Sequence, residues 1–179
     1  MIAIVSGKNR CRIDKGYFTG VSEHDGGLYA AEYTGKIHVY EQVGEWKECR
    51  RIDLGLKMQE ITLSIQDVMI YVCLCRDSKL VTYSLSGIKL GSWGSEGCEE
   101  AGDLDEPDLC IVGTGGAALV ADTRSYRLQV LSADRQWSVV SLQPPVRMPM
   151  SALLYRDRLL VASEKDNTLN VYKTSGDDH

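Results

Sequence analysis

The chain lacks the features that mark several large classes of protein. No apolar run approaches the ~18 residues that a transmembrane helix needs, so we predict no membrane span. The apolar stretch from Ile2 to Val5 is far shorter than the core of a secretory signal, and the basic residues follow it. A cytoplasmic location is therefore expected. No stretch keeps a sustained helical period, which argues against a helical protein.

Residues that do catalytic chemistry are also scarce. The three histidines, His24, His38 and His179, have no acid and nucleophile at motif spacing, which argues against a serine or cysteine triad. No P-loop, dinucleotide fingerprint or paired-histidine zinc motif occurs. The six cysteines lack the spacing of a disulfide-rich domain, and we expect structural thiols. The sequence therefore predicts a protein that is not an enzyme and uses no metal or cofactor.

The net charge of the chain argues against nucleic acid as a ligand. The net charge is −5 and the chain holds a single phenylalanine, whereas nucleic-acid binders are commonly basic. Acidic residues cluster further between Glu96 and Asp108, where we expect a solvated loop that repels phosphate.

What the chain does contain is a repeat. Four segments share a short apolar strand, a polar turn and a second, alternating strand: GLYAAEYTGKIHVYE, MIYVCLCRDSKLVTYS, ALVADTRSYRLQVLS and LLVASEKDNTLNVYK. Aligning them superimposes Ile37, Leu80, Leu128 and Leu169. The repeat period is roughly forty to fifty residues, with several strands in each unit, which is typical of propeller blades.

Alternation favours strands within each unit. Ile37 and Val39 share one strand face, with Lys36, His38 and Tyr40 on the other. We predict an all-β propeller of four antiparallel, four-stranded blades within one domain over residues 1–179. The predicted blades cover about residues 17–52, 60–93, 109–142 and 152–173.

The fourth blade supplies only three strands, and one strand is left over at the other end of the chain. This extra strand contains Ile2, Ala3, Ile4 and Val5. We predict that it pairs beside the last strand, which holds Leu169 and Val171. The pairing would complete the blade and leave no open sheet edge to aggregate.

These residues resemble the NHL-repeat family of propellers. The match is best in ALVADTRSYRLQVLS, which is similar to the family's strand, Ala-Asp-Thr turn, arginine and alternating strand. The resemblance spans roughly residues 17–173 and is weaker in the first two blades. It implies a propeller like those of tripartite-motif ubiquitin ligases, which binds proteins or RNA. Family propellers usually carry six blades, whereas this chain has four.

Three assemblies are compatible with four blades. They close alone, they pair with a second chain into an eight-bladed ring, or they form part of a larger propeller. Blades suited to a six-fold ring rotate by less than a closed four-fold ring requires. This mismatch favours pairing, in which a two-fold ring covers both open faces.

The leading functional hypothesis is a protein-interaction scaffold whose open ends drive self-association. The alternative is single-stranded RNA binding by a basic rim of Arg76, Arg124, Arg127, Arg156 and Arg158. A second alternative is a metal-dependent hydrolase or lactonase that uses Glu32, Asp122 and Glu164. We expect Asp122 and a nearby arginine, Arg124, to serve instead as turn architecture.

Overall fold

The secondary structure is almost entirely β-strand. The computed structural model describes residues 3–6, 9–12 and 16–174. The only helical element within these ranges is the short 3-10 turn η1 (Thr114–Gly116), which is far too short to cross a bilayer. The chain divides into two compact units, residues 1–72 with 81–91 and residues 73–80 with 92–179. The single domain over residues 1–179 stays a prediction.

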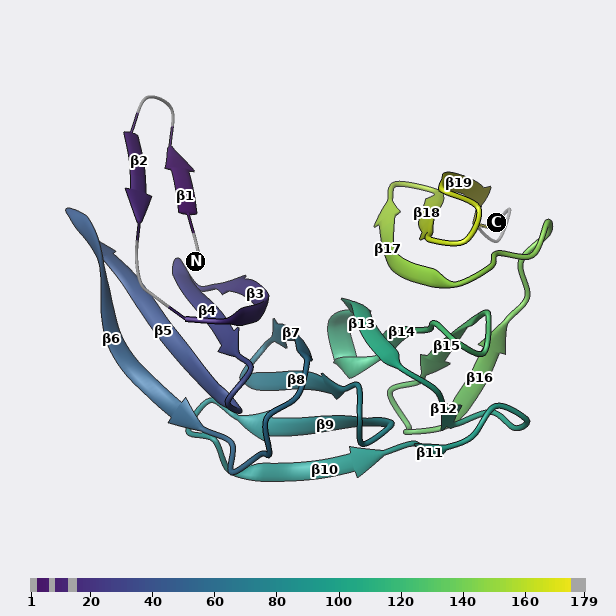
Figure 1. The fold of residues 1–179 in the computed structure, drawn as a ribbon, viewed down its shortest axis with the longest axis horizontal. Coiled ribbons are helices and arrows are strands. Elements are labelled where there is room, and N and C mark those ends of the chain that lie inside the picture. The colour runs from purple at the N-terminus through teal and green to yellow at the C-terminus, as the bar shows by residue number, and fades with distance from the viewer. Residues whose placement is uncertain (1–2, 7–8, 13–15, 175–179) are drawn as a thin grey trace. The chain divides into compact units, whose positions relative to one another are not determined.

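The first sheet is an antiparallel meander in the first unit (Figure 1). Its strands are β3 (Phe18–His24), β4 (Gly27–Glu32), β5 (Lys36–Val43) and β6 (Glu45–Asp53). All four predicted strands of the first blade are confirmed. Both faces of β5 are buried along Ile37 to Tyr40, and the two tight turns on either side of β4 use left-handed glycines at Gly26 and Gly35.

The second sheet is again an antiparallel array of four strands, joined in chain order. The strands are β7 (Ile61–Gln66), β8 (Met69–Leu74), β9 (Lys79–Ser84) and β10 (Lys89–Trp93). Strand β7 alternates buried Ile61, Leu63 and Ile65 with half-buried polar residues. Strand β8 is a continuous apolar run that is buried on both faces, as expected of a strand between two packed layers.

Side chain to backbone hydrogen bonds join the first two sheets within the first unit. Thr19 Oγ1 donates to the Ile61 carbonyl oxygen at 2.8 Å and accepts from the Ile61 amide at 3.1 Å. A Cβ at Gly20 would lie 2.9 Å from the same carbonyl oxygen, so only glycine permits this approach of β3 to β7.

The third sheet belongs to the second unit. Its strands are β13 (Pro107–Val112), β14 (Ala118–Asp122), β15 (Arg127–Leu131) and β16 (Trp137–Val140). A short parallel pair precedes it, β11 (Ser95–Glu96) with β12 (Asp103–Leu104). The acidic segment expected as a solvated loop therefore contains two short strands.

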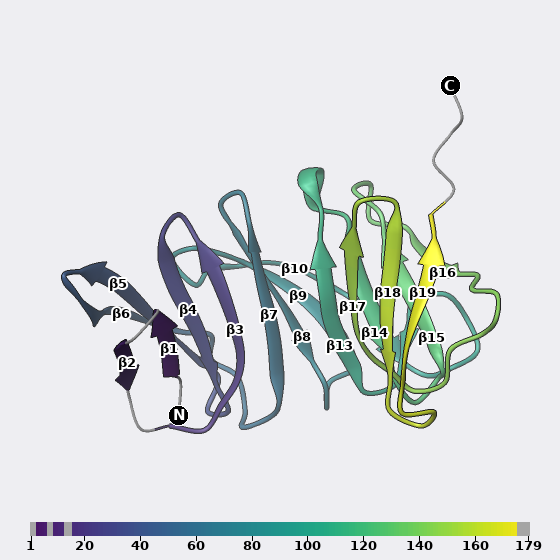
Figure 2. The same ribbon diagram turned by 90° about the horizontal axis from the view of Figure 1, so that it is seen from above.

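The fourth sheet has three strands in the described part of the chain, β17 (Pro149–Tyr155), β18 (Arg158–Ser163) and β19 (Thr168–Lys173). Figure 2 shows them side by side, with β19 at the edge. One face packs on the third sheet, where Ala121, Leu128, Ala152, Leu159 and Val161 form a buried core. The three strands predicted within residues 152–173 are confirmed.

The predicted pairing of the N-terminal strand with the last strand stays a prediction, because the two strands belong to different units. Strand β1 (Ala3–Ser6), which contains Ala3, Ile4 and Val5, pairs with β2 (Asn9–Arg12) in an antiparallel hairpin. Ile2 lies outside the described residues. Only two residues separate the strands, so the hairpin costs far less loop-closure entropy than a pairing with β19. Among the described residues, β19, which carries Leu169 and Val171, pairs with β18 alone.

Candidate interaction surface

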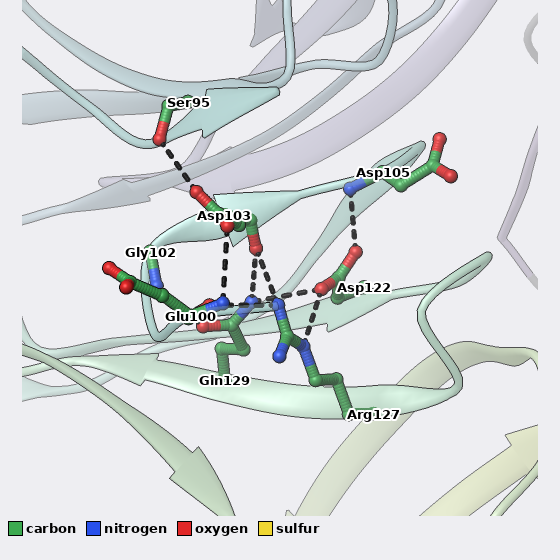
Figure 3. A network of polar contacts seen from close by, with 8 residues as sticks. All are labelled: Ser95, Glu100, Gly102, Asp103, Asp105, Asp122, Arg127 and Gln129. Carbon is green, nitrogen blue, oxygen red and sulfur yellow. Dashed lines mark hydrogen bonds and ion pairs between the residues drawn. The ribbon is translucent and has the colours of Figure 1, made fainter. Parts of the chain in front are cut away.

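Asp122, at the end of β14, is the centre of a polar network in the second unit (Figure 3). Its side chain is fully buried. Its Oδ2 accepts from Arg127 Nε and from Gln129 Nε2, both at 2.9 Å, and its Oδ1 accepts from the Asp105 amide at 2.7 Å. A buried carboxylate is tolerated only when it is paired and hydrogen-bonded, and both conditions are met here.

The same two side chains hold the acidic segment in place. Arg127 Nη2 donates to the carbonyl oxygens of Glu100 and Asp103 at 3.0 and 2.9 Å. Gln129 donates to the Asp103 carbonyl oxygen and accepts from the Gly102 amide. The Glu100 amide and the Ser95 hydroxyl hydrogen-bond to the Asp103 carboxylate and lower its pKa. The acids of this segment are therefore partly structural (Figure 3).

The arginine that pairs with Asp122 is Arg127, not the predicted Arg124. Arg124 instead contacts Glu106, with Nη2 2.8 Å from Oε1, and both side chains are substantially exposed. The alternation of β15 explains this choice, because Arg127 starts the strand next to Asp122 in register. Within the described residues, no group of three histidine, cysteine or acidic side chains is placed to hold a metal.

The predicted basic rim does not form one surface. Lys165 Nζ lies 5.1 Å from the Tyr126 ring, so the β14–β15 turn with Arg124 and the β18–β19 turn share one edge. Arg156 lies in the β17–β18 turn, and Arg158 is the first residue of β18. Successive turns of an antiparallel meander alternate ends, which puts these two arginines at the opposite edge.

The remaining two arginines of the rim are Arg127 and Arg76. The side chain of Arg127 is 14% exposed and committed to the Asp122 network. Arg76 lies in the β8–β9 turn.

The outer face of the fourth sheet is an exposed apolar surface. By register, Leu153, Leu160 and Val171 lie in one row across the three strands, and Ala162 and Leu169 lie in the next. Leu153, Leu169 and Val171 are 58%, 64% and 57% exposed. Exposed apolar patches of this kind, with polar residues around them, commonly mark interaction sites. We call these five residues the outer face.

Sequence reasoning missed a cluster in the first unit, in which buried His38 lies between two partly buried glutamates. Alternation puts His38 on the strand face opposite Ile37 and Val39, and its side chain there is only 5% exposed. Its Nε2 and Nδ1 each lie 3.4 Å from a glutamate oxygen, of Glu32 and Glu48 respectively. The ring also contacts Phe18 edge to face. The overlooked signal in the sequence is the run of apolar residues that flanks His38 along the chain, because such a run indicates a strand with both faces buried.

No protein-family model matches this chain, and no curated protein sequence matches it either. Solved structures do. A structure of unknown function from Bacteroides thetaiotaomicron superimposes with a TM-score of 0.76 at 14% identity, over 88% of this chain and 47% of that one. The computationally designed Ika4 protein gives 0.61 at 10% identity, over 90% and 94%. A streptogramin B lyase gives 0.62 at 14% identity, over 93% and 58%.

These likenesses concern the fold alone, because the identities are low. Together with the four antiparallel sheets they establish an all-β fold of the propeller class, with four blades. The chain spans about half the length of the Bacteroides structure and of the lyase, and nearly the whole of the designed protein.

Proposed function

We propose that this chain is a non-catalytic protein-interaction module, and that it self-associates through the outer face and the edge of β19. The observation that carries the proposal is the fourth sheet, which has three strands in the described residues where the other three blades have four. An edge strand presents unpaired backbone groups, and this one also carries two exposed apolar side chains, Leu169 and Val171.

Burial of the outer face in an interface would lower the free energy of the protein. Complete burial of a leucine or valine side chain is worth about 1.5–3 kcal/mol. Leu153, Leu169 and Val171 are each more than half exposed. Burying the exposed part of each side chain in an interface would therefore contribute roughly 1 kcal/mol. Strand pairing at the β19 edge would add backbone hydrogen bonds to this apolar contribution.

The charges around the outer face favour a second copy of the chain as the partner. Arg158 and Lys173 face each other in register at one end of the sheet. Glu164, Lys165 and Asp166 lie in the turn at the opposite end, which therefore carries a net negative charge. In a two-fold dimer the outer face of one copy contacts the outer face of the other, with the two faces running in opposite directions. The basic end of one copy then lies over the acidic turn of the other. The patch is therefore complementary to itself.

The resemblance to NHL repeats supports a binding role, and the Asp122–Arg127 pair gives its Ala-Asp-Thr and arginine residues a structural purpose.

The arrangement of the arginines does not favour RNA as the ligand. Arg127 is engaged with Asp122, Arg124 contacts Glu106, and Arg156 and Arg158 lie at another edge. Single-strand binding needs a continuous basic groove with stacking platforms.

Sedimentation velocity over a range of concentrations tests the proposal. The wild-type chain is expected to sediment as a dimer at high concentration, and Val171→Asp as a monomer, because a carboxylate on the outer face is costly to bury. Val43→Asp is the matched control, since Val43 is also an exposed strand valine but lies in the first sheet. A wild-type chain that is monomeric at every concentration overturns the proposal.

A further inference from the structure

A polar cavity of about 360 Å³ lies in the first unit, at the end of the first sheet that carries the β3–β4 turn. This turn and the second half of β5 provide most of its lining. Leu85, which directly follows β9 of the second sheet, also lines it. All of these residues belong to the same compact unit. The volume is within the range of common ligand sites, which begin near 300 Å³.

The register of the strands explains how the cavity forms. His24, Gly27 and Glu41 lie in one row across β3, β4 and β5, so their positions share one face of the sheet. Gly27 has no side chain, and a Cβ there would lie 3.5 Å from Tyr29 Cε2. The tyrosine ring therefore takes the place of a side chain at Gly27 and contributes to the cavity wall. The sheet itself positions this part of the lining.

Tyr29 gives the cavity a polar group that the fold leaves without a partner. The residue is only 7% exposed, and its ring meets that of His24 edge to face, with centroids 6.3 Å apart. Its hydroxyl makes no hydrogen bond with another described residue and is not sealed off from solvent. A largely buried hydroxyl favours a ligand that hydrogen-bonds to it, because leaving such a group unsatisfied is costly.

The charged side chains of the lining are acidic. Asp25, in the turn, and Glu41, on β5, both line the cavity, and neither makes an ion pair within the described residues. No lysine or arginine is among the described residues of the lining. The charge of Glu41 also acts on the Cys49 thiol, whose pKa is raised by burial and then by the hydrogen bond with Glu41. The cavity therefore favours a cation.

Two basic residues lie near the cavity but outside its lining. Lys47 and Arg50, on β6, are opposite Glu41 and Val39 in register. Both are exposed, and neither makes an ion pair with a carboxylate of the described residues. An exposed pair of this kind contributes little in water. A cation inside the cavity therefore competes well with Lys47 for Glu41.

An arginine side chain matches this lining. Its planar head carries several donors in a rigid fork and can bond two carboxylates at once, whereas a lysine head is a point charge. Its apolar stem can pack on Val39, Val43 and Leu85, which also line the cavity. About seven non-hydrogen atoms at ~30 Å³ each need roughly 200 Å³, which leaves room for a few bridging waters.

We propose that this cavity receives an arginine side chain from a partner protein, with the guanidinium between the carboxylates of Asp25 and Glu41 and near the Tyr29 hydroxyl. The inference rests on the proposed function only in taking the partner to be a protein. The cavity and the outer face belong to different units, and the site does not require self-association. Sedimentation tests the dimer, whereas ligand titration tests the cavity.

N-acetyl-arginine amide is the probe, because the guanidinium is its only charge. It is titrated into the full chain and followed by amide NMR. We expect saturable shifts of the signals of Gly26, Gly27 and Gln42, which line the cavity. N-acetyl-citrulline amide has nearly the same shape without the charge and should bind about tenfold more weakly, because charge-assisted hydrogen bonds are the stronger ones. N-acetyl-lysine amide should bind with an affinity between the two.

Three variants locate the site. Glu41→Gln keeps the size of an exposed side chain and should lower the affinity for the arginine probe about tenfold, the effect of one hydrogen bond to a charged group. Tyr29→Phe removes only the hydroxyl and should lower the affinity about threefold. Glu45→Gln is the matched control, because Glu45 is an exposed glutamate at the start of β6 that does not line the cavity. It should leave the affinity unchanged.

Three results overturn the proposal. The cavity does not receive arginine if the arginine probe shows no saturable binding. The site does not recognise the cation if the citrulline probe binds as tightly as the arginine probe. The binding is a general attraction to acidic surface if Glu45→Gln weakens it as much as Glu41→Gln does.

Discussion

At the scale of single residues, the carboxylate of Asp122 is the most constrained group of the second unit. It is fully buried, and its two oxygens accept three hydrogen bonds. Its charge is neutralised by Arg127, whose Nη2 group donates to the carbonyl oxygens of Glu100 and Asp103 in the acidic segment. Loss of the carboxylate would leave both the guanidinium and the Asp105 amide without their partner.

Replacement of Asp122 is therefore expected to be severe. Asp122→Ala should lower the free energy of unfolding by about 3–5 kcal/mol, the usual cost of removing one member of a buried ion pair. Urea denaturation measures this. Glu106→Ala is the comparison, because it removes the exposed contact with Arg124 and should cost at most about 1 kcal/mol. Equal losses in the two variants would contradict a structural role for the network.

The His38 cluster makes the stability depend on pH. A hydrogen bond from Thr34, and then the nearby His38, lower the pKa of Glu32 below the ordinary value of 4.5. The hydrogen bond from Arg51, followed by His38, does the same for Glu48. Because the folded-state pKa values are depressed, both groups contribute stability that is present above the unfolded value and lost as the pH falls through the folded one.

The midpoints of urea denaturation, measured at a series of pH values from neutral down to about 3, should show this loss of stability. Glu32→Gln is expected to be less stable than the wild type at neutral pH and to lose less stability on acidification. The control is Glu23→Gln, in the same sheet but outside the His38 cluster. The interpretation fails if Glu32→Gln and the wild type lose stability equally between these pH values.

At the scale of elements, the acidic segment is fixed by close packing as well as by hydrogen bonds. Gly102 has a φ of +93°, and a Cβ there would lie 2.7 Å from the Trp137 ring. Gly115 has a similar φ of +78°, but a Cβ there would meet nothing within 4 Å. A side chain at Gly115 would therefore meet backbone strain alone, whereas a side chain at Gly102 would meet the same strain and a steric clash with Trp137.

Alanine at each position tests this difference. Gly115→Ala should cost about 1–2 kcal/mol, because only the left-handed backbone is penalised. Gly102→Ala should cost a further 1–3 kcal/mol, because Trp137 must move. Thermal unfolding of the two variants measures the difference, and equal melting temperatures would show that the segment does not pack on Trp137.

Alternation and turn residues were enough to predict the strands of all four sheets. Ile37 with Val39, and Leu128 with its neighbours, mark strands because period-two patterns are local properties of the chain. The pairing of β1 could not be predicted, since any short apolar strand can join a neighbour or a distant edge. The separation of Arg124 from Arg156 could have been predicted, because it follows from the order of strands and turns.

The polar contacts were harder to predict. Asp122 had two arginines within five residues, and only the register of β14 with β15 selects Arg127. The cluster around His38 depends on β6 bringing Glu48 beside β5.

At the scale of the whole molecule, the chain is a propeller-class protein whose fourth sheet keeps an apolar outer face and an edge strand in the described residues. The proposed dimer covers both. The charged ends of the dimer interface lie at the surface, so salt should screen their attraction and weaken the dimer. The apolar contact at the centre of the interface should remain. Sedimentation at low and high ionic strength should therefore show a modest rise in the dissociation constant. No change would argue against the reversed alignment of the two copies.

Amide hydrogen exchange in β19 tests the interface most directly. The account predicts that the amides of Thr168–Lys173 become better protected as the protein concentration rises, in the wild type and in Val43→Asp but not in Val171→Asp. Exchange in β19 that is fast and identical at every concentration would contradict it, because the edge strand would then have no partner.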